Sequence, residues 1–262
     1  MSILPEMEFI KIQQTKKEKN SGQFVIEPLM PGYGVTIGNS LRRILLSSLT
    51  GAAVHAVRVS GINHEFAPIP GAKEDMIELI LNLKSLRLRL QTDEPTTITL
   101  KAKGPGEIRA KNFATNPLVE IVDPNHYLLT LDKKGTLEIE AMVGKGYGYT
   151  PTERKREEKL PSGWIVVDSI YSPITKVNYV IDNTRVGQIT NFDKVTLDIT
   201  SDGTIAPAEA LRQAAEILAY HFNFITKIGE KTTSTKAAKA KPAAATEIAK
   251  PAAKPTKKTI AK

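Results

Sequence analysis

The sequence predicts an α+β fold in which helix-bearing segments flank a long β-rich stretch. Three observations support this class. An apolar stripe with helical spacing follows a glycine-rich turn near the N-terminus, alternating apolar and polar residues fill much of 54–170, and a long helix is expected from Pro207 to about Ile228. Residues 231–262 contain almost no large apolar side chain, so we expect them to be a disordered tail.

The composition limits the kinds of protein that this chain can be. Its 262 residues are 41% hydrophobic, which suffices for one or two packed cores. The absence of cysteine excludes disulfides, thiolate metal sites and cysteine nucleophiles. No apolar run approaches the ~18 residues of a membrane span, and the N-terminus lacks the pattern of a secretory signal. We therefore expect a cytoplasmic protein without a membrane partner.

The net charge of +8 is concentrated at one end of the chain. Residues 231–262 contain nine lysines and one glutamate, whereas residues 1–230 contain 27 basic and 27 acidic residues. The folded part therefore has no bulk charge that attracts nucleic acid, but the tail has.

Three glycines, Gly32, Gly34 and Gly38, lead into the first predicted helix, for which Thr36 is the expected N-cap. They allow two interpretations: a phosphate-binding loop, or a tight turn packed close to other backbone. Their spacing differs by one residue from the dinucleotide-binding fingerprint, and no P-loop motif or βαβ pattern accompanies them. The turn is therefore favoured, and we expect no cofactor.

The first predicted helix is amphipathic. Its apolar stripe follows the spacing i, i+3, i+4, i+7 and i+8, at Leu41, Ile44, Leu45, Ser48 and Leu49. Arg42 and Arg43 lie beside this stripe, where they are available to another partner.

Short strands and one further helix are expected between the first and last helices. We predict extended pieces at 9–12 and 23–26 joined as a hairpin, strands at 54–59, 86–90, 97–103, 137–143, 178–182 and 195–199, and a helix at 72–83. Residues 144–163 are rich in glycine and in charges that nearly cancel, which favours a solvated polar loop over a phosphate site.

The last predicted helix has a seam that is typical of helix pairing. Its apolar residues step by 4, 3, 4 and 3, at Leu211, Ala215, Leu218, Phe222 and Ile225. The simpler interpretation is one more core helix. However, other faces of the same helix also carry apolar residues, and a helix that is apolar on several sides needs more than one partner. A second copy of the chain would supply such a partner, and we expect a homodimer. The Leu41, Leu45 and Leu49 stripe is expected to meet this seam, in the same chain or in its twin.

No catalytic or metal-binding pattern is visible. The four histidines are scattered without the spacing of a metal site, and no local Ser/His/Asp or acidic cluster occurs. The residues therefore indicate an assembling protein rather than an enzyme in its own right.

Seven blocks of residues closely resemble the bacterial RNA polymerase alpha subunit, in the family order. They are GYGVTIGNSLRRILLSS (32–48), GINHEF (61–66), KEDMIELILNLK (73–84), GKGY (144–147), VDSIYSP (167–173), RVGQIT (185–190) and GTIAPAEA (203–210). This resemblance implies a discontinuous dimerisation domain at 1–52 and 172–230, with residues 53–171 inserted as a second domain. It also implies a non-catalytic subunit whose dimer recruits the two large catalytic subunits, beta and beta-prime.

The same resemblance assigns contact residues to both large subunits. It implies contacts with one at Arg42, Arg43 and Leu46, and with the other at Lys84, Val167 and Asp168. The dimer contacts expected are Leu41, Leu45, Leu49, Leu211, Ala215, Leu218, Phe222 and Ile225.

The sequence departs from the family in its tail. The family continues into a compact helical DNA-binding domain, whereas residues 231–262 are rich in Lys, Ala and Pro. We expect either non-specific DNA binding by this tail, or an inert solubilising tail or a linker whose domain has been lost. A free-standing nucleic-acid-binding protein that acts through the tail is the alternative function, and a nucleotide-binding enzyme using the Gly32–Gly38 turn is a more distant one.

Overall fold

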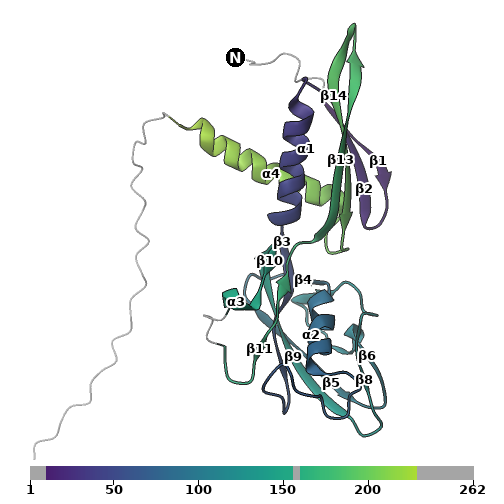
Figure 1. Ribbon diagram of the computed structural model, residues 1–262, viewed down its shortest axis with the longest axis vertical. Helices are drawn as coiled ribbons and strands as arrows, with labels where there is room; N and C mark the ends of the chain where they lie inside the picture. Colours follow the sequence, from purple (N-terminus) through teal and green to yellow (C-terminus); the bar gives the residue numbers. More distant parts are fainter. Residues whose placement is uncertain (1–9, 156–159, 229–262) are drawn as a thin grey trace, which may run out of the picture.

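The computed structural model describes residues 10–155 and 160–228, so the predicted tail at 231–262 lies outside the described residues. The molecule is elongated, with two bodies stacked end to end (Figure 1). We call residues 10–49 and 172–228 the sheet–helix body and residues 50–171 the β-rich body. Each has its own cluster of buried apolar side chains. Helices and antiparallel sheets occur in both bodies, which confirms the predicted α+β class.

The sheet–helix body is built on a four-stranded antiparallel sheet. Its strand order is β1 (Lys11–Lys17), β2 (Ser21–Leu29), β14 (Ile189–Ser201) and β13 (Ile174–Val186). The predicted N-terminal hairpin corresponds to β1 and β2. The strands expected at 178–182 and 195–199 are the middle parts of β13 and β14, which form a long hairpin.

Two helices pack in this body, α1 (Tyr33–Ser47) and α4 (Pro207–Thr226). Helix α1 lies against β13, β14 and α4. Its Leu41 and Leu45 are buried, as is Leu49 just beyond its end, and all three join a cluster that includes Leu211. The predicted apolar stripe thus packs against the seam helix of the same chain.

Helix α1 begins earlier than predicted because a distant carboxylate caps it. Its N-cap is Gly32, in the left-handed region at φ +88°, and not Thr36. The backbone N–H groups of Gly32 and Gly34 each donate to Oδ2 of Asp193 at 2.9 Å. A Cβ at Gly34 would lie 2.9 Å from that oxygen, and one at Gly38 would lie 2.8 Å from the ring of Tyr179. The glycines therefore allow close packing, against side chains rather than backbone.

The β-rich body contains ten strands in its described part. They are β3 (Thr50–Val59), β4 (Leu88–Leu90), β5 (Thr96–Lys103), β6 (Gly106–Arg109), β7 (Val119–Ile121), β8 (Tyr127–Leu131), β9 (Thr136–Tyr147), β10 (Tyr149–Thr150), β11 (Ile165–Val166) and β12 (Ser169–Ile170). The main sheet has the order β5-β9-β3-β4-β7, with β11 also paired to β3. Helix α2 (Met76–Ser85) packs against β3, β8 and β12.

Two expectations for this body need correction. The helix expected at 72–83 starts at Met76, because the carboxylate of Asp75 accepts from the N–H of Glu78 and caps it there. The segment 144–163 is not simply a solvated loop: β9 continues to Tyr147, and β10 and the short helix α3 (Thr152–Lys155) follow. Lys155 itself is only 2% exposed.

Candidate assembly interfaces

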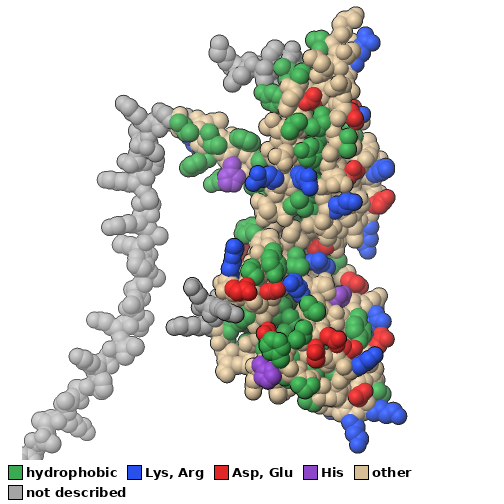
Figure 2. Space-filling view, viewed as in Figure 1, with side chains coloured by type: hydrophobic (Ala, Val, Ile, Leu, Met, Phe, Trp, Pro, Cys, Tyr) green, Lys and Arg blue, Asp and Glu red, His purple; other side chains and the backbone are tan. Residues whose placement is uncertain are grey.

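The second half of helix α4 projects away from both bodies (Figure 1). Hydrophobic side chains run along this projecting part (Figure 2). Phe222 is 58% exposed, Phe224 73% and Ile225 56%. Monomeric proteins rarely leave a contiguous apolar surface of this kind in water, so it is a candidate contact surface.

The residues predicted for the dimer seam separate into two groups. Leu41, Leu45, Leu49 and Leu211 are buried inside the chain's own core and do not reach the surface. Ala215, Phe222 and Ile225 are exposed and Leu218 is half-buried. We call Ala215, Leu218, Phe222 and Ile225 the α4 apolar face. The intrachain group anchors the base of α4 and leaves this face uncovered.

Arg42, Arg43 and Leu46, which we call the α1 patch, lie on the outer side of helix α1. All three are exposed, Leu46 by 36%, because the neighbouring Leu41 and Leu45 turn inward. Among residues 10–155 and 160–228, neither guanidinium group has a hydrogen-bond or ion-pair partner. The fork of an arginine suits bidentate pairing with a carboxylate, so the α1 patch can bind an acidic surface.

The second predicted contact site is assembled from three separate segments. Lys84 lies in the last turn of α2, and its Nζ is 3.0 Å from Oδ2 of Asp168. The Tyr149 hydroxyl donates to the same oxygen at 2.9 Å, and the Thr152 N–H donates to Oδ1 at 2.9 Å. The ammonium group also lies 5.2 Å from the centre of the Tyr149 ring. We call Lys84, Tyr149 and Asp168 the α2 patch.

Electrostatics hold the α2 patch in its charged form. The hydrogen bond to Asp168 raises the pKa of Lys84 above its ordinary value. Burial alone would raise the pKa of Asp168, but hydrogen bonds from Lys84, Thr152 and Tyr149 outweigh it and lower that pKa. Lys84 and Asp168 therefore form a charged pair at neutral pH, and the Lys84 side chain is only 25% exposed.

Val167 occupies a different environment from its neighbour. In the segment from Ile165 to Ser169, alternate side chains point inward, so Val167 is fully buried while Asp168 reaches the surface. The side chain of Val167 therefore does not form part of the exposed surface.

Two residues of this region, Tyr149 and Lys155, were not predicted from the sequence, because they lie in the segment interpreted as a loop. The available signal was the aromatic side chain of Tyr149 in a glycine-rich stretch.

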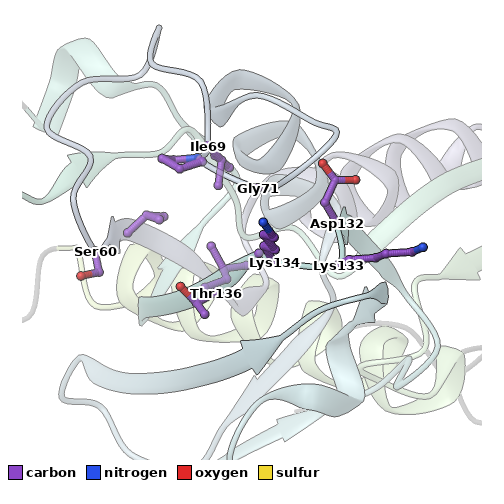
Figure 3. Close-up of a pocket in the computed structure, with 11 residues that line it drawn as sticks. Ser60, Ile69, Gly71, Asp132, Lys133, Lys134 and Thr136 are labelled. Carbon is purple, nitrogen blue, oxygen red and sulfur yellow. The ribbon is translucent and has the colours of Figure 1, made fainter.

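A surface cavity of about 840 Å³ lies beside the turn that joins β8 and β9 (Figure 3). Its charged lining residues Asp132, Lys133 and Lys134 are all exposed. Because these charged side chains stay in contact with water, their position in the cavity does not indicate a specific ligand site. Across the described part of the chain, no group of His, Asp and Glu could hold a metal ion, and no helix is long and apolar enough to cross a membrane.

Comparison with known sequences identifies the inserted part. A family model described as the RNA polymerase Rpb3/RpoA insert domain matches residues 57–172, which make up most of the β-rich body. The chain, in which a sheet–helix body carries this insert, therefore falls in the class of RNA polymerase subunits with an Rpb3/RpoA-type insert domain.

Relatives that extend over both bodies narrow the identification. A DNA-directed RNA polymerase subunit alpha of Moorella thermoacetica is 47% identical over 228 residues, covering 87% of this chain and 73% of the relative. The alpha subunit of Symbiobacterium thermophilum is 50% identical over 214 residues, covering 81% and 68%. That of Clostridium beijerinckii is 45% identical, covering 87% and 72%. The chain belongs to the DNA-directed RNA polymerase alpha subunit family, which confirms the resemblance seen in the sequence.

Proposed function

We propose that the chain acts as a homodimeric, non-catalytic scaffold on which the two large catalytic subunits of RNA polymerase, beta and beta-prime, assemble. The observation that carries this proposal is the α4 apolar face, exposed on a helix that projects from the molecule. Burial of such a face is worth roughly 25 cal/mol per Å² of apolar surface. A second copy can supply the same face, because a two-fold interface pairs one surface with itself.

In this proposal the dimerisation domain spans 1–52 and 172–230 and contains the sheet–helix body, and the inserted domain spans 53–171 and makes up most of the β-rich body. The α1 patch binds one large subunit and the α2 patch binds the other. Two observations support this division. The α1 patch presents two arginines without partners among the described residues, and the α2 patch joins three segments into one charged surface.

Sedimentation velocity of the full chain tests the dimer. We expect the wild type to sediment as a dimer at micromolar concentration, and the double variant Phe222→Ser/Ile225→Ser to sediment as a monomer. Both residues are exposed, so the variant should keep its fold. A matched control is Phe66→Ser/Leu118→Ser, which changes two exposed apolar residues of the β-rich body and should remain dimeric. A wild type that is monomeric at all concentrations would refute the dimeric scaffold.

A further inference from the structure

The two bodies meet at a second place besides the points where the chain crosses between them. Strand β4 of the β-rich body faces the turn Asp202–Gly203–Thr204, which joins β14 to α4 in the sheet–helix body. Arg89 of β4 and Arg87, just before this strand, reach the turn. The contact is therefore made between segments that are about 115 residues apart.

Arg89 makes the larger part of this contact. Its Nε donates to the carbonyl of Thr204 at 2.5 Å, and its Nη2 donates to the carbonyl of Gly203 at 2.9 Å. The remaining nitrogen, Nη1, donates to both carboxylate oxygens of Glu120 at 3.2 Å. Glu120 pairs with Arg89 across β4 and β7, so it holds the guanidinium in the plane that the two carbonyls require.

Arg87 contacts the same turn two residues earlier. Its Nε lies 3.7 Å from Oδ2 of Asp202, a carboxylate that is 6% exposed. The other oxygen, Oδ1, accepts from the N–H and the hydroxyl of Thr204 and so shapes the turn. Gly203 adopts φ +93°, which aims its carbonyl and the next one at Arg89.

The chain crossings form the other attachment between the bodies. A Cβ at Gly51 would lie 1.7 Å from the carbonyl oxygen of Tyr171, so the two crossing segments pack backbone to backbone. A groove of about 740 Å³, lined by residues that include Gly51, Arg89 and Thr204, separates this attachment from the β4 contact. Two attachments on either side of a groove fix an orientation, whereas the crossings alone would act as a hinge.

We propose that Arg87 and Arg89 form a clamp that fixes the orientation of the β-rich body on the sheet–helix body. The clamp sets the distance between the α1 patch and the α2 patch, which lie on different bodies. Its role in recruitment rests on the proposed scaffold function. Arg89 is then a positioning residue for recruitment of the large subunit that binds the α2 patch. Because the clamped turn leads directly into α4, the same contact relates the β-rich body to the α4 apolar face.

Distance measurement between spin labels tests the clamp without any large subunit. The chain contains no cysteine, so Lys17→Cys on β1 and Lys103→Cys on β5 allow specific labelling of the two bodies at exposed positions. Labelled chain is diluted with unlabelled chain so that only distances within one copy are recorded. We expect a narrow distance distribution for the wild-type background and a broadened one for Arg89→Met and for Arg87→Met.

The matched control is Arg109→Met. Arg109 likewise donates to a backbone carbonyl, that of Asn125, and pairs with a glutamate, Glu107, but both partners belong to its own body. It should leave the distribution narrow. An unchanged distribution in both Arg89→Met and Arg87→Met would overturn the clamp, whatever the chain binds.

Recruitment provides the second measurement. In binding assays with the large subunits, Arg89→Met should weaken recruitment through the α2 patch roughly tenfold while the dimer mass stays unchanged. A broadened distribution with unaltered recruitment would overturn the positioning role. Failure of the wild type itself to recruit either large subunit would instead refute the proposed function, and the spin-label result would still decide the clamp.

Discussion

Lys84 and Asp168 lie 84 positions apart in the sequence, yet Nζ of one is 3.0 Å from Oδ2 of the other. The lysine lies in the last turn of helix α2, where a positive charge is favoured by the helix dipole. The aspartate is fixed by two further donors, Tyr149 and the N–H of Thr152. The pair therefore connects α2 to the segments before and after the undescribed residues 156–159, and it makes the α2 patch a defined surface.

This pair should make the stability of the β-rich body depend on pH. The lowered pKa of Asp168 gives a contribution that is present above the unfolded value of about 3.9 and lost as the pH falls through the folded value. The raised pKa of Lys84 gives one that is present below about 10.4 and lost as the pH rises through the folded value. The pair thus stabilises between about pH 4 and about pH 10, by roughly 1 kcal/mol.

Urea unfolding at pH 7, 5 and 3 measures this contribution. Asp168→Asn should lower the free energy of unfolding at pH 7, and the variant should lose less stability than the wild type between pH 5 and pH 3. Glu138→Gln, which breaks the more exposed ion pair with Lys101, is the control and should change the pH profile less than Asp168→Asn does. Equal steepness for the wild type and Asp168→Asn would contradict the assignment.

The capping of α1 by Asp193 predicts a loss of stability in the sheet–helix body. Asp193→Ala removes the acceptor of two backbone N–H groups at the start of the helix and should cost about 1–3 kcal/mol. Asp198→Ala, on the same strand with one hydrogen bond from Gln23, should cost less. Denaturant unfolding followed by circular dichroism compares the two variants, and equal losses would show that the cap is unimportant.

The buried Lys155 should be a structural requirement of the β-rich body. Its Nζ donates to the carbonyl of Val167 at 2.7 Å and to Oγ of Ser169 at 2.6 Å. Lys155→Met keeps the apolar stem but leaves these buried acceptors without that donor, at a cost of about 1–3 kcal/mol. Lys133→Met at an exposed position should change the melting temperature little. Thermal unfolding of both variants checks this, and a Lys155→Met protein as stable as wild type would be inconsistent with it.

The fold class and most elements could be predicted because they depend on local periodicity. The stripe at Leu41, Leu45 and Leu49 and the alternation around Leu137–Val143 each require only neighbouring residues. The start of α1 was wrong because its cap comes from Asp193, about 160 residues away. The predicted start of helix α2, at Ala72, was four residues too early. Residues 72–75 have a helical composition, but Asp75 is the N-cap and the helix begins at Met76.

The contact residues show the same limit. Arg42 and Arg43 could be assigned to an outer face from helical spacing alone. The resemblance assigned Lys84 and Asp168 to one contact site but did not predict that they pair with each other. The burial of Val167 beside Asp168 follows from strand alternation in a segment too short to recognise in the sequence. Contacts across the bodies, such as Arg89 with Gly203, leave no periodic signal in the sequence.

The cationic tail predicts a measurable effect on DNA binding. If its nine lysines contact phosphates, the logarithm of DNA affinity should fall with the logarithm of salt concentration with a slope of up to about −8. Deleting residues 231–262 should then reduce both the affinity and the slope. Fluorescence anisotropy on duplex DNA of unrelated sequences measures both quantities, and identical values for the two proteins would mean that the tail is inert toward DNA.

The central claim is that a dimer of this chain carries the two large subunits on separate patches. Light scattering coupled to size exclusion, on the full chain mixed with both large subunits, tests it most directly. We predict a particle with two copies of this chain and one of each large subunit for the wild type, a dimer lacking one large subunit for Arg43→Ala, and a dimer lacking the other for Lys84→Ala. A normally assembled particle in both variants, or one that contains a single copy of the chain, would contradict the account.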